Sequence, residues 1–174
     1  MLPQVKRVNY FSGQLLTTAD LQAEQVYFIE KLKRHNQYLH GFGVAQGLEV
    51  SLSDSPPGEV IVQPGMAIDQ CGHEVVLSSP QRGPLPEVGK KAFLILSWAE
   101  RETDFIPAMT GEGEGETTAA SRVEEYAELK YEATRPDEEG VDSGNRCGIT
   151  LARLKKRGGV WRADLRFEVR RVRG

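Results

Sequence analysis

Six consecutive residues, Asp69 to Glu74, hold the densest group of side chains in this sequence that could do chemistry, in the order Asp-Gln-Cys-Gly-His-Glu. Along an extended strand, Asp69, Cys71 and His73 would lie on one face, because side chains two residues apart point the same way. Carboxylate, thiolate and imidazole groups are all ligands of zinc or iron. One hypothesis is therefore a small metal-dependent hydrolase that uses the Asp69–Glu74 segment.

The same segment also has a simpler explanation as a turn. Gly72 predicts a tight turn that breaks the alternation of a strand, and the usual spacings of zinc ligands are absent. We therefore predict no catalytic residue, no bound metal and no cofactor.

The remaining histidines and cysteines give weaker signals. His35 and His40 are five residues apart at the end of a predicted helix, so we do not expect them to share a face. The distant Cys71 and Cys147 do not resemble a disulfide framework or a CxxC metal pair. Nothing near Cys147 marks an activated thiol, although a nucleophile pair of Cys147 with a histidine stays open. The sequence has no GxSxG, P-loop or GxGxxG motif.

Size and composition predict one globular domain, or one domain with an appended element. The chain has 174 residues, of which 39% are hydrophobic and 27% charged. Eighteen glycines and nine prolines indicate many turns, which favours a β-rich fold over a helix bundle. The net charge of −3 gives no overall positive field, so we expect no nucleic acid among the partners.

The charge is nevertheless unevenly placed along the chain. Residues 100–139 are acidic, whereas residues 153–173 are strongly basic. The arginines of this basic end alternate with apolar residues, which predicts a surface or edge strand. As a phosphate-binding surface it would be small and opposed by the acidic remainder. We interpret it as a salt-bridging face or a protein interface.

A helix is predicted near the N-terminus. Thr17 supplies a hydroxyl cap and Asp20 a carboxylate at the positive end of the helix dipole. The helix then carries apolar residues seven, four and seven apart, a spacing that keeps them on one face. These are Leu21, Phe28, Leu32 and Leu39. Gly41 and Gly43 are expected to end the helix.

From residue 43 onward the hydrophobic period changes to two, and about eight short strands follow. The apolar run 92–98 predicts a central strand buried on both faces, and Gly158-Gly159 predicts a hairpin turn. The Gly-Glu repeat within residues 103–120 predicts a mobile acidic loop. The fold class is α+β, mainly β, with an N-terminal helix and then a compact antiparallel β-sandwich or barrel-like domain. We expect residues 1–42 to hold the N-terminal segment and the helix, and residues 43–174 to form the β-rich domain.

The sequence also bears on location. Its first residues lack the basic and apolar stretches of a secretion signal, and no apolar run is long enough for a membrane span. We expect the chain to stay in the cytoplasm until it is exported as part of an assembled particle.

Two stretches of the sequence carry a resemblance to a known group. The first stretch begins with Val-Asn-Tyr-Phe-Ser-Gly-Gln-Leu-Leu-Thr at residues 8–17, followed by Asp20-Leu21 and by Glu-Gln-Val-Tyr at residues 24–27. It ends with Leu39-His40-Gly41-Phe42-Gly43-Val44 and Gly47-Leu48-Glu49-Val50. This pattern resembles the opening of bacterial proteins of phage tails and extracellular contractile injection systems. Residues 62–69, 72–75 and 98–104 fit the same group, so the resemblance covers about the first 105 residues.

The resemblance implies a non-enzymatic structural or adaptor subunit in a baseplate, fibre or cap region. It transfers no catalytic residue, and it implies protein partners of a tail-like assembly and a homo-oligomer. The Asp69–Glu74 segment is then expected to be a folding device, in which Pro64-Gly65 sets a turn and Asp69 caps the bend before Gly72.

Residues 1–42, the N-terminal segment and helix, are then expected to be a docking or oligomerisation element. Aromatic and apolar side chains of the N-terminal element are then candidates for the interface, since such groups dominate interface energetics. They are Tyr10, Phe11, Tyr27, Phe28, Leu32 and Phe42. A glycan-binding module that stacks a sugar on Trp98 or Trp161 is a further alternative, although Trp161 fits core packing better.

Overall fold

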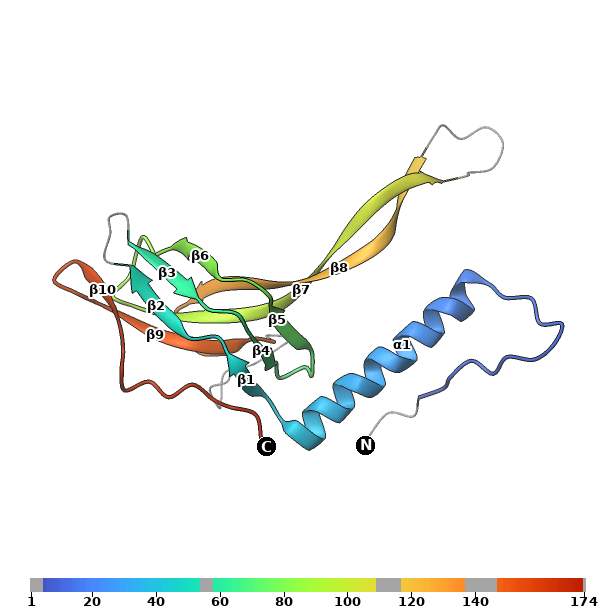
Figure 1. Cartoon of the computed structure of the whole chain (residues 1–174), viewed down its shortest axis with the longest axis horizontal. Coiled ribbons are helices and arrows are strands. Elements are labelled where there is room, and N and C mark those ends of the chain that lie inside the picture. Colours follow the sequence, from blue (N-terminus) through green and yellow to red (C-terminus); the bar gives the residue numbers. More distant parts are fainter. Residues whose placement is uncertain (1–4, 54–57, 109–116, 137–146, 174) are drawn as a thin grey trace.

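The N-terminal part of the chain is helical and the rest is built from strands (Figure 1). The computed structural model describes residues 5–53, 58–108, 117–136 and 147–173. Helix α1 spans Thr18–His35 and continues into one π-helical turn, η1, at Asn36–His40. The strands that follow are β1 (Gly43–Gly47), β2 (Val50–Ser53), β3 (Glu59–Val62), β4 (Gly65–Ile68), β5 (Glu74–Leu77), β6 (Gln81–Pro84), β7 (Lys91–Ala108), β8 (Thr117–Glu132), β9 (Ile149–Arg157) and β10 (Val160–Ala163).

Within the described ranges, the strands form three antiparallel sheets. The largest has the order β10-β9-β7-β8, and the two smaller sheets have the orders β1-β4-β5 and β2-β3-β6. The predicted class, α+β and mainly β with an N-terminal helix, is therefore confirmed.

The core lies between these sheets and is centred on the first half of β7. Residues 92–96 are all buried, and Leu94 and Leu96 have no exposed surface. They share one hydrophobic cluster with Val62 of β3 and Leu154 of β9. The continuous apolar run thus forms a central strand, flanked by β8 and β9, as the sequence predicts.

Beyond the core, β7 and β8 continue as a two-stranded arm that projects away from the sheets (Figure 1). We define the arm as residues 99–108 of β7 and 117–127 of β8. The predicted loop over residues 103–120 is wrong at both ends, because pairing continues from Thr103↔Arg122 to Ala108↔Thr117. Phe105, Ile106 and other strand-forming residues extend the ladder on both sides of the repeat. The Gly-Glu repeat itself lies outside the described residues.

Helix α1 begins where the sequence predicts. Thr17 and Asp20 form a capping box, and the hydrogen bond from the Thr17 side chain lowers the pKa of Asp20. The α-helix ends at His35, earlier than expected, because Asn36–His40 adopt the π-helical turn before Gly41, whose φ is +70°. None of the helices in the described ranges has the length and hydrophobicity of a membrane span.

The C-terminal segment differs from the prediction of a continuing strand. The Gly158-Gly159 turn is confirmed, with φ values of +57° and +83°, but β10 ends at Ala163. Leu165 beyond it is 97% exposed, and within the described residues the next backbone bridge to a strand is that of Arg171 with Val44. Between them Phe167 lies against Phe93 of β7, and Val169 packs on the core. Alternation alone does not predict where β10 ends, because a strand also depends on pairing with a neighbour.

Truncation of a buried side chain in β7 should lower the stability of the fold. Leu94→Ala removes a buried side chain and leaves a cavity, so we expect a loss of about 2–5 kcal/mol in the free energy of unfolding. Urea denaturation followed by circular dichroism measures it. Val88→Ala is the matched control, because Val88 is 82% exposed and should change stability by less than about 0.5 kcal/mol. Equal losses in the two variants would contradict the assigned core.

Candidate functional site

The Asp69–Glu74 segment forms a turn around the buried carboxylate of Asp69. The backbone N–H groups of Cys71 and His73 donate to Asp69 Oδ1 at 2.8 and 2.9 Å. His73 Nδ1 donates to Oδ2 of the same carboxylate at 2.9 Å. Asp69 is fully buried, and Gly72 turns the chain with a φ of +84°. The predictions that Asp69 caps this bend and that Gly72 makes a tight turn are confirmed.

The turn interrupts the strand, as predicted, but it still leaves the three candidate ligands close together. Ligand atoms of Asp69, Cys71 and His73 lie within 4.8 Å of one another, because the turn wraps around the carboxylate. Two of the three groups already have other partners, however. Both oxygens of Asp69 accept hydrogen bonds, and Cys71 forms a disulfide with Cys147. The geometry therefore serves the turn, and with the disulfide formed it offers no free thiolate to a metal.

The disulfide corrects the expectation drawn from the cysteine spacing. Cys71 and Cys147 are 76 residues apart, but the pairing of β7 with β9 brings the start of β9 beside the turn. Their Cα atoms are 5.7 Å apart, within the usual range for a disulfide. Gln70 adds a second link, since its Oε1 accepts from Gly148 N at 2.8 Å. No sequence signal could have shown this pairing, because it depends on strand order.

The same turn holds the C-terminal end of the helix. Asn36, which is buried, donates from Nδ2 to Gly72 O at 3.0 Å and to Glu74 Oε1 at 3.4 Å. Gln37 Nε2 donates to Gln70 O at 3.0 Å. Gly72 packs so closely on the backbone of Lys33 that an added Cβ would collide with the Lys33 carbonyl oxygen. The segment that looked most like an active site is thus the attachment point of α1.

The π-helical turn also overturns the expectation for the two helix histidines. His35 Nε2 and His40 Nε2 lie 3.3 Å apart, and the ring centroids are 5.2 Å apart. In a π-helix, residues five apart are aligned, whereas in an α-helix they are not. The prediction assumed a regular α-helix, and the spacing in the sequence does not show where such a turn forms.

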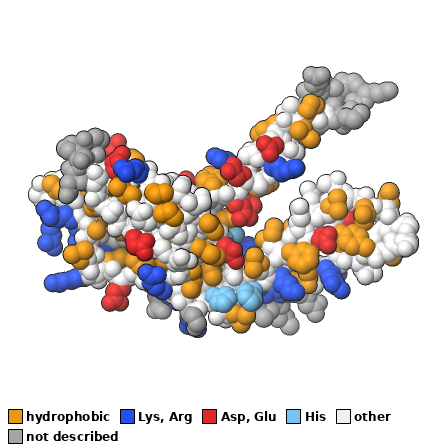
Figure 2. Space-filling view, in the orientation of Figure 1, with side chains coloured by type: hydrophobic (Ala, Val, Ile, Leu, Met, Phe, Trp, Pro, Cys, Tyr) orange, Lys and Arg blue, Asp and Glu red, His pale blue; other side chains and the backbone are white. Residues whose placement is uncertain are grey.

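Helix α1 itself has no buried residue, and hydrophobic side chains lie along it in the open (Figure 2). We call its apolar side the helix face. The exposed fractions of its members are 52% for Leu21, 57% for Val26, 58% for Phe28, 50% for Ile29 and 48% for Leu32. Amphipathic helices normally bury this side against a core. Here each of these side chains remains about half exposed.

The six predicted interface residues fall into two groups. Tyr10, Phe11, Tyr27, Phe28 and Leu32 belong to the helix or to the segment beside it. Tyr10 ties that segment to α1, because its hydroxyl donates to Glu24 Oε2 at 2.6 Å. Phe42 lies elsewhere, against the core, with the Arg170 guanidinium 3.7 Å from its ring centroid. Leu15, Leu16, Tyr38 and Leu39 are also exposed apolar residues of this part of the chain. The sequence placed Leu39 on the apolar side of the helix, but none of the four was predicted at the interface.

The two tryptophans both have partners. Trp161 is 7% exposed and donates from Nε1 to Pro86 O at 2.8 Å, so its predicted place in the core is confirmed. Trp98 stacks on His73, with ring centroids 4.1 Å apart and an interplanar angle of 6°. Stacking on His73 covers a face of the Trp98 ring that a sugar would need.

Comparison with known proteins finds likeness only at the level of structure. No protein-family model and no curated protein sequence matches the chain. Similar solved structures include a chain of the TssK-TssF-TssG baseplate subcomplex of a type VI secretion system (TM-score 0.56, 14% identity), a chain of a type VI secretion baseplate complex (0.57, 13%) and TssK itself (0.53, 13%). They cover 95%, 96% and 92% of this chain. This chain in turn spans 62%, 42% and 41% of theirs. At such identities the likeness establishes a shared fold.

Gly72→Ala should loosen the attachment of the helix. A side chain at positive φ costs about 1–2 kcal/mol, and the collision with Lys33 adds to this. Gly89→Ala is the matched control, because Gly89 has a φ of +96° but only an ordinary contact at 3.6 Å. We expect faster amide hydrogen exchange over residues 33–40 in Gly72→Ala alone. Similar exchange in the two variants would show that the contact with Lys33 is unimportant.

Reduction of the disulfide should destabilise the chain. The bond closes a long loop, so its loss should cost about 2–4 kcal/mol, measured by urea denaturation with and without reductant. The double variant Cys71→Ser/Cys147→Ser should have the stability of the reduced wild-type chain, with and without reductant. A wild-type chain that does not respond to reductant would contradict this assignment.

Proposed function

We propose that this chain is a non-enzymatic structural or adaptor subunit of a phage-tail-like contractile assembly, in its baseplate, fibre or cap region. Helix α1 and the segment before it would be the docking element. The observation that carries the proposal is the open helix face on a helix that has no buried residue. The proposal includes self-association and contacts with other protein components.

The energetics favour a partner on the helix face. Burial of a large apolar side chain contributes about 1.5–3 kcal/mol, and most helices in proteins owe their stability to such packing. Five large apolar side chains of α1 are about half exposed or more. Large exposed apolar surfaces mark sites of protein–protein contact. The attachment through Asn36 and Gln37 fixes the base of the helix and leaves this surface free.

Two further observations support an assembly of this kind. The fold is shared with proteins from type VI secretion baseplates, one of them in a subcomplex with TssF and TssG. The residue pattern within residues 8–50 resembles proteins of phage tails and contractile injection systems. By contrast, the side chains that would serve a hydrolase hold a turn or form a disulfide.

Light scattering coupled to size exclusion tests the proposal. We expect a discrete multimer for the wild-type chain and a smaller species for Phe28→Ser/Leu32→Ser, because the substitutions remove apolar area from the helix face. Val88→Ser is the control, since Val88 is exposed but lies in the connection between β6 and β7.

Metal analysis of the same chromatographic peak tests the hydrolase alternative. A monomer that carries one equivalent of zinc or iron would contradict the structural proposal. It would indicate a metal site at Asp69, Cys71 and His73. A multimer without stoichiometric metal supports it.

A further inference from the structure

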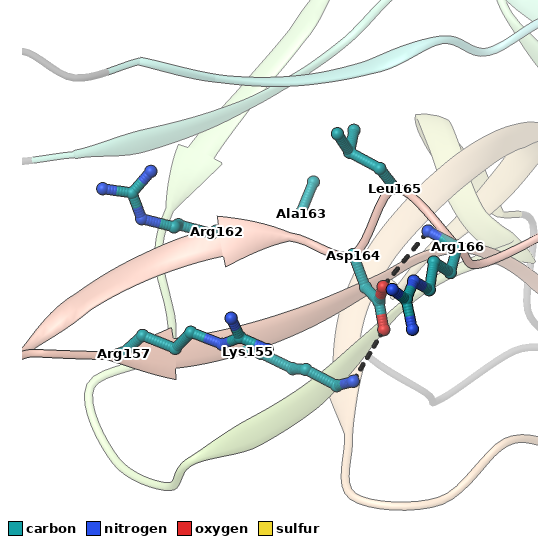
Figure 3. A pocket seen from close by; sticks show the side chains of 7 residues that line it. All are labelled: Lys155, Arg157, Arg162, Ala163, Asp164, Leu165 and Arg166. Atoms are coloured by element: carbon teal, nitrogen blue, oxygen red, sulfur yellow. Dashed lines mark hydrogen bonds and ion pairs between the residues drawn. The ribbon is translucent and has the colours of Figure 1, made fainter.

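The outer face of the β9–β10 hairpin holds a basic pocket of about 320 Å³ (Figure 3). Its charged lining residues are Lys155, Arg157, Arg162, Arg166 and Asp164, so four cations face one carboxylate. Dashed lines in Figure 3 join Asp164 to Lys155 and to the backbone of Arg166, whereas Arg162 points away from it. Arg157 and Arg162 have no ion-pair partner among the described residues.

Asp164 is fully occupied by its own neighbours and cannot neutralise the pocket. Lys155 Nζ lies 2.8 Å from its Oδ2, Arg153 pairs with the same oxygen, and Arg166 N donates to Oδ1 at 3.1 Å. The hydrogen bond from Lys155 contributes most to holding the pKa of Asp164 well below its usual range. The carboxylate is therefore ionised at neutral pH and serves to organise the cations around it.

The arm carries the opposite charge pattern at the other end of the molecule. Glu100 and Glu102 lie two residues apart on one face of β7, and Glu125 of β8 stands directly opposite Glu100. All three are exposed, and none has an ion-pair partner in the described ranges. Like charges directly opposite each other destabilise a strand pair. The Glu100–Glu125 pair thus lowers the stability of the arm in an isolated chain.

The basic hairpin repeats this arrangement with the sign reversed. Lys155 and Arg157 lie two residues apart on one face of β9, and Arg162 of β10 stands directly opposite Lys155. Each of these groups of three like charges lies on an antiparallel strand pair. In both groups the side chains are therefore about 6.6–6.8 Å apart along the strand and about 5 Å apart across it. Exposed apolar side chains border each group. They are Ile106 and Val123 on the arm, and Val160 and Leu165 at the hairpin.

We infer that the acidic face of the arm (Glu100, Glu102, Glu125) docks on the basic hairpin (Lys155, Arg157, Arg162) of a second copy of this chain. The arm and the hairpin lie at opposite ends of the molecule, so they do not meet within one copy (Figure 1). The contact joins different surfaces on the two copies, and such head-to-tail contacts build rings or filaments. It rests on the self-association in the proposed function, but it uses a surface separate from the helix face.

Charge-reversal variants of the two surfaces test the contact between copies. Glu100→Lys/Glu102→Lys/Glu125→Lys and Arg157→Glu/Arg162→Glu should each weaken association of the chain by at least about tenfold, because several exposed ion pairs become repulsive. A mixture of the two variants should restore a hetero-complex, measured by sedimentation velocity. Lys155 stays unchanged because it holds Asp164, and circular dichroism confirms that both variants fold. If the mixture does not associate, the inference is wrong.

The wild-type chain provides a test without substitutions. A zero-length carbodiimide reagent joins lysine amines to carboxylates in direct contact, and mixed isotope-labelled and unlabelled chains distinguish links between copies. We expect links from Lys155 to Glu100, Glu102 or Glu125 between copies, with a yield that falls as salt rises, since screening weakens exposed charge pairs. Lys155 linked only to Asp164 of its own chain would overturn the inference.

A third measurement separates this contact from the helix face. Glu125→Gln relieves the repulsion with Glu100, so it should leave the melting temperature unchanged or higher while association weakens. A purely structural role for Glu125 would move the two readouts together. If Phe28→Ser/Leu32→Ser disperses the multimer and the charge variants do not, the proposed role of the helix face stands and the inferred arm contact is wrong.

Discussion

The buried carboxylate of Asp69 is the interaction on which the arrangement of this molecule depends. A buried charge is costly unless it is hydrogen-bonded, and here two backbone N–H groups and the His73 ring satisfy it. The turn that results presents Gly72 to the helix backbone and offers carbonyl oxygens to Asn36 and Gln37. The end of α1 is thus held by a turn that a buried side chain outside the helix organises.

The molecule separates a closely packed body from two projecting elements. The buried residues in the described ranges lie mainly in the strands around β7, whereas α1 and the arm are exposed along their length. One projection is apolar, and one face of the other is acidic. Apolar surface provides binding energy without direction, whereas charge patterns select a partner and its register. Two such elements on one rigid body suit a subunit that must join neighbours in a fixed geometry.

The sequence predicted the features that local chemistry decides. The Thr17–Asp20 cap, the central strand and the Gly158-Gly159 turn depend on residues near one another in the chain. The features it missed depend on tertiary contacts. The disulfide of Cys71 with Cys147 follows from strand order, and the meeting of His35 with His40 follows from a π-helical turn. The strands of the arm extended past the predicted loop boundaries because each stabilises the other through pairing.

The attachment of α1 near its C-terminal end has a mechanical consequence. An 18-residue helix is about 27 Å long, so a tilt of about 10° at its base moves its far end by about 5 Å. The helix would pivot about the π-helical turn and the Asp69 turn. A small rearrangement there, for example on reduction of the neighbouring disulfide, would be amplified at the Tyr10–Glu24 end of the helix. The position of a neighbour bound to α1 would then depend on the conformation of the Asp69 turn.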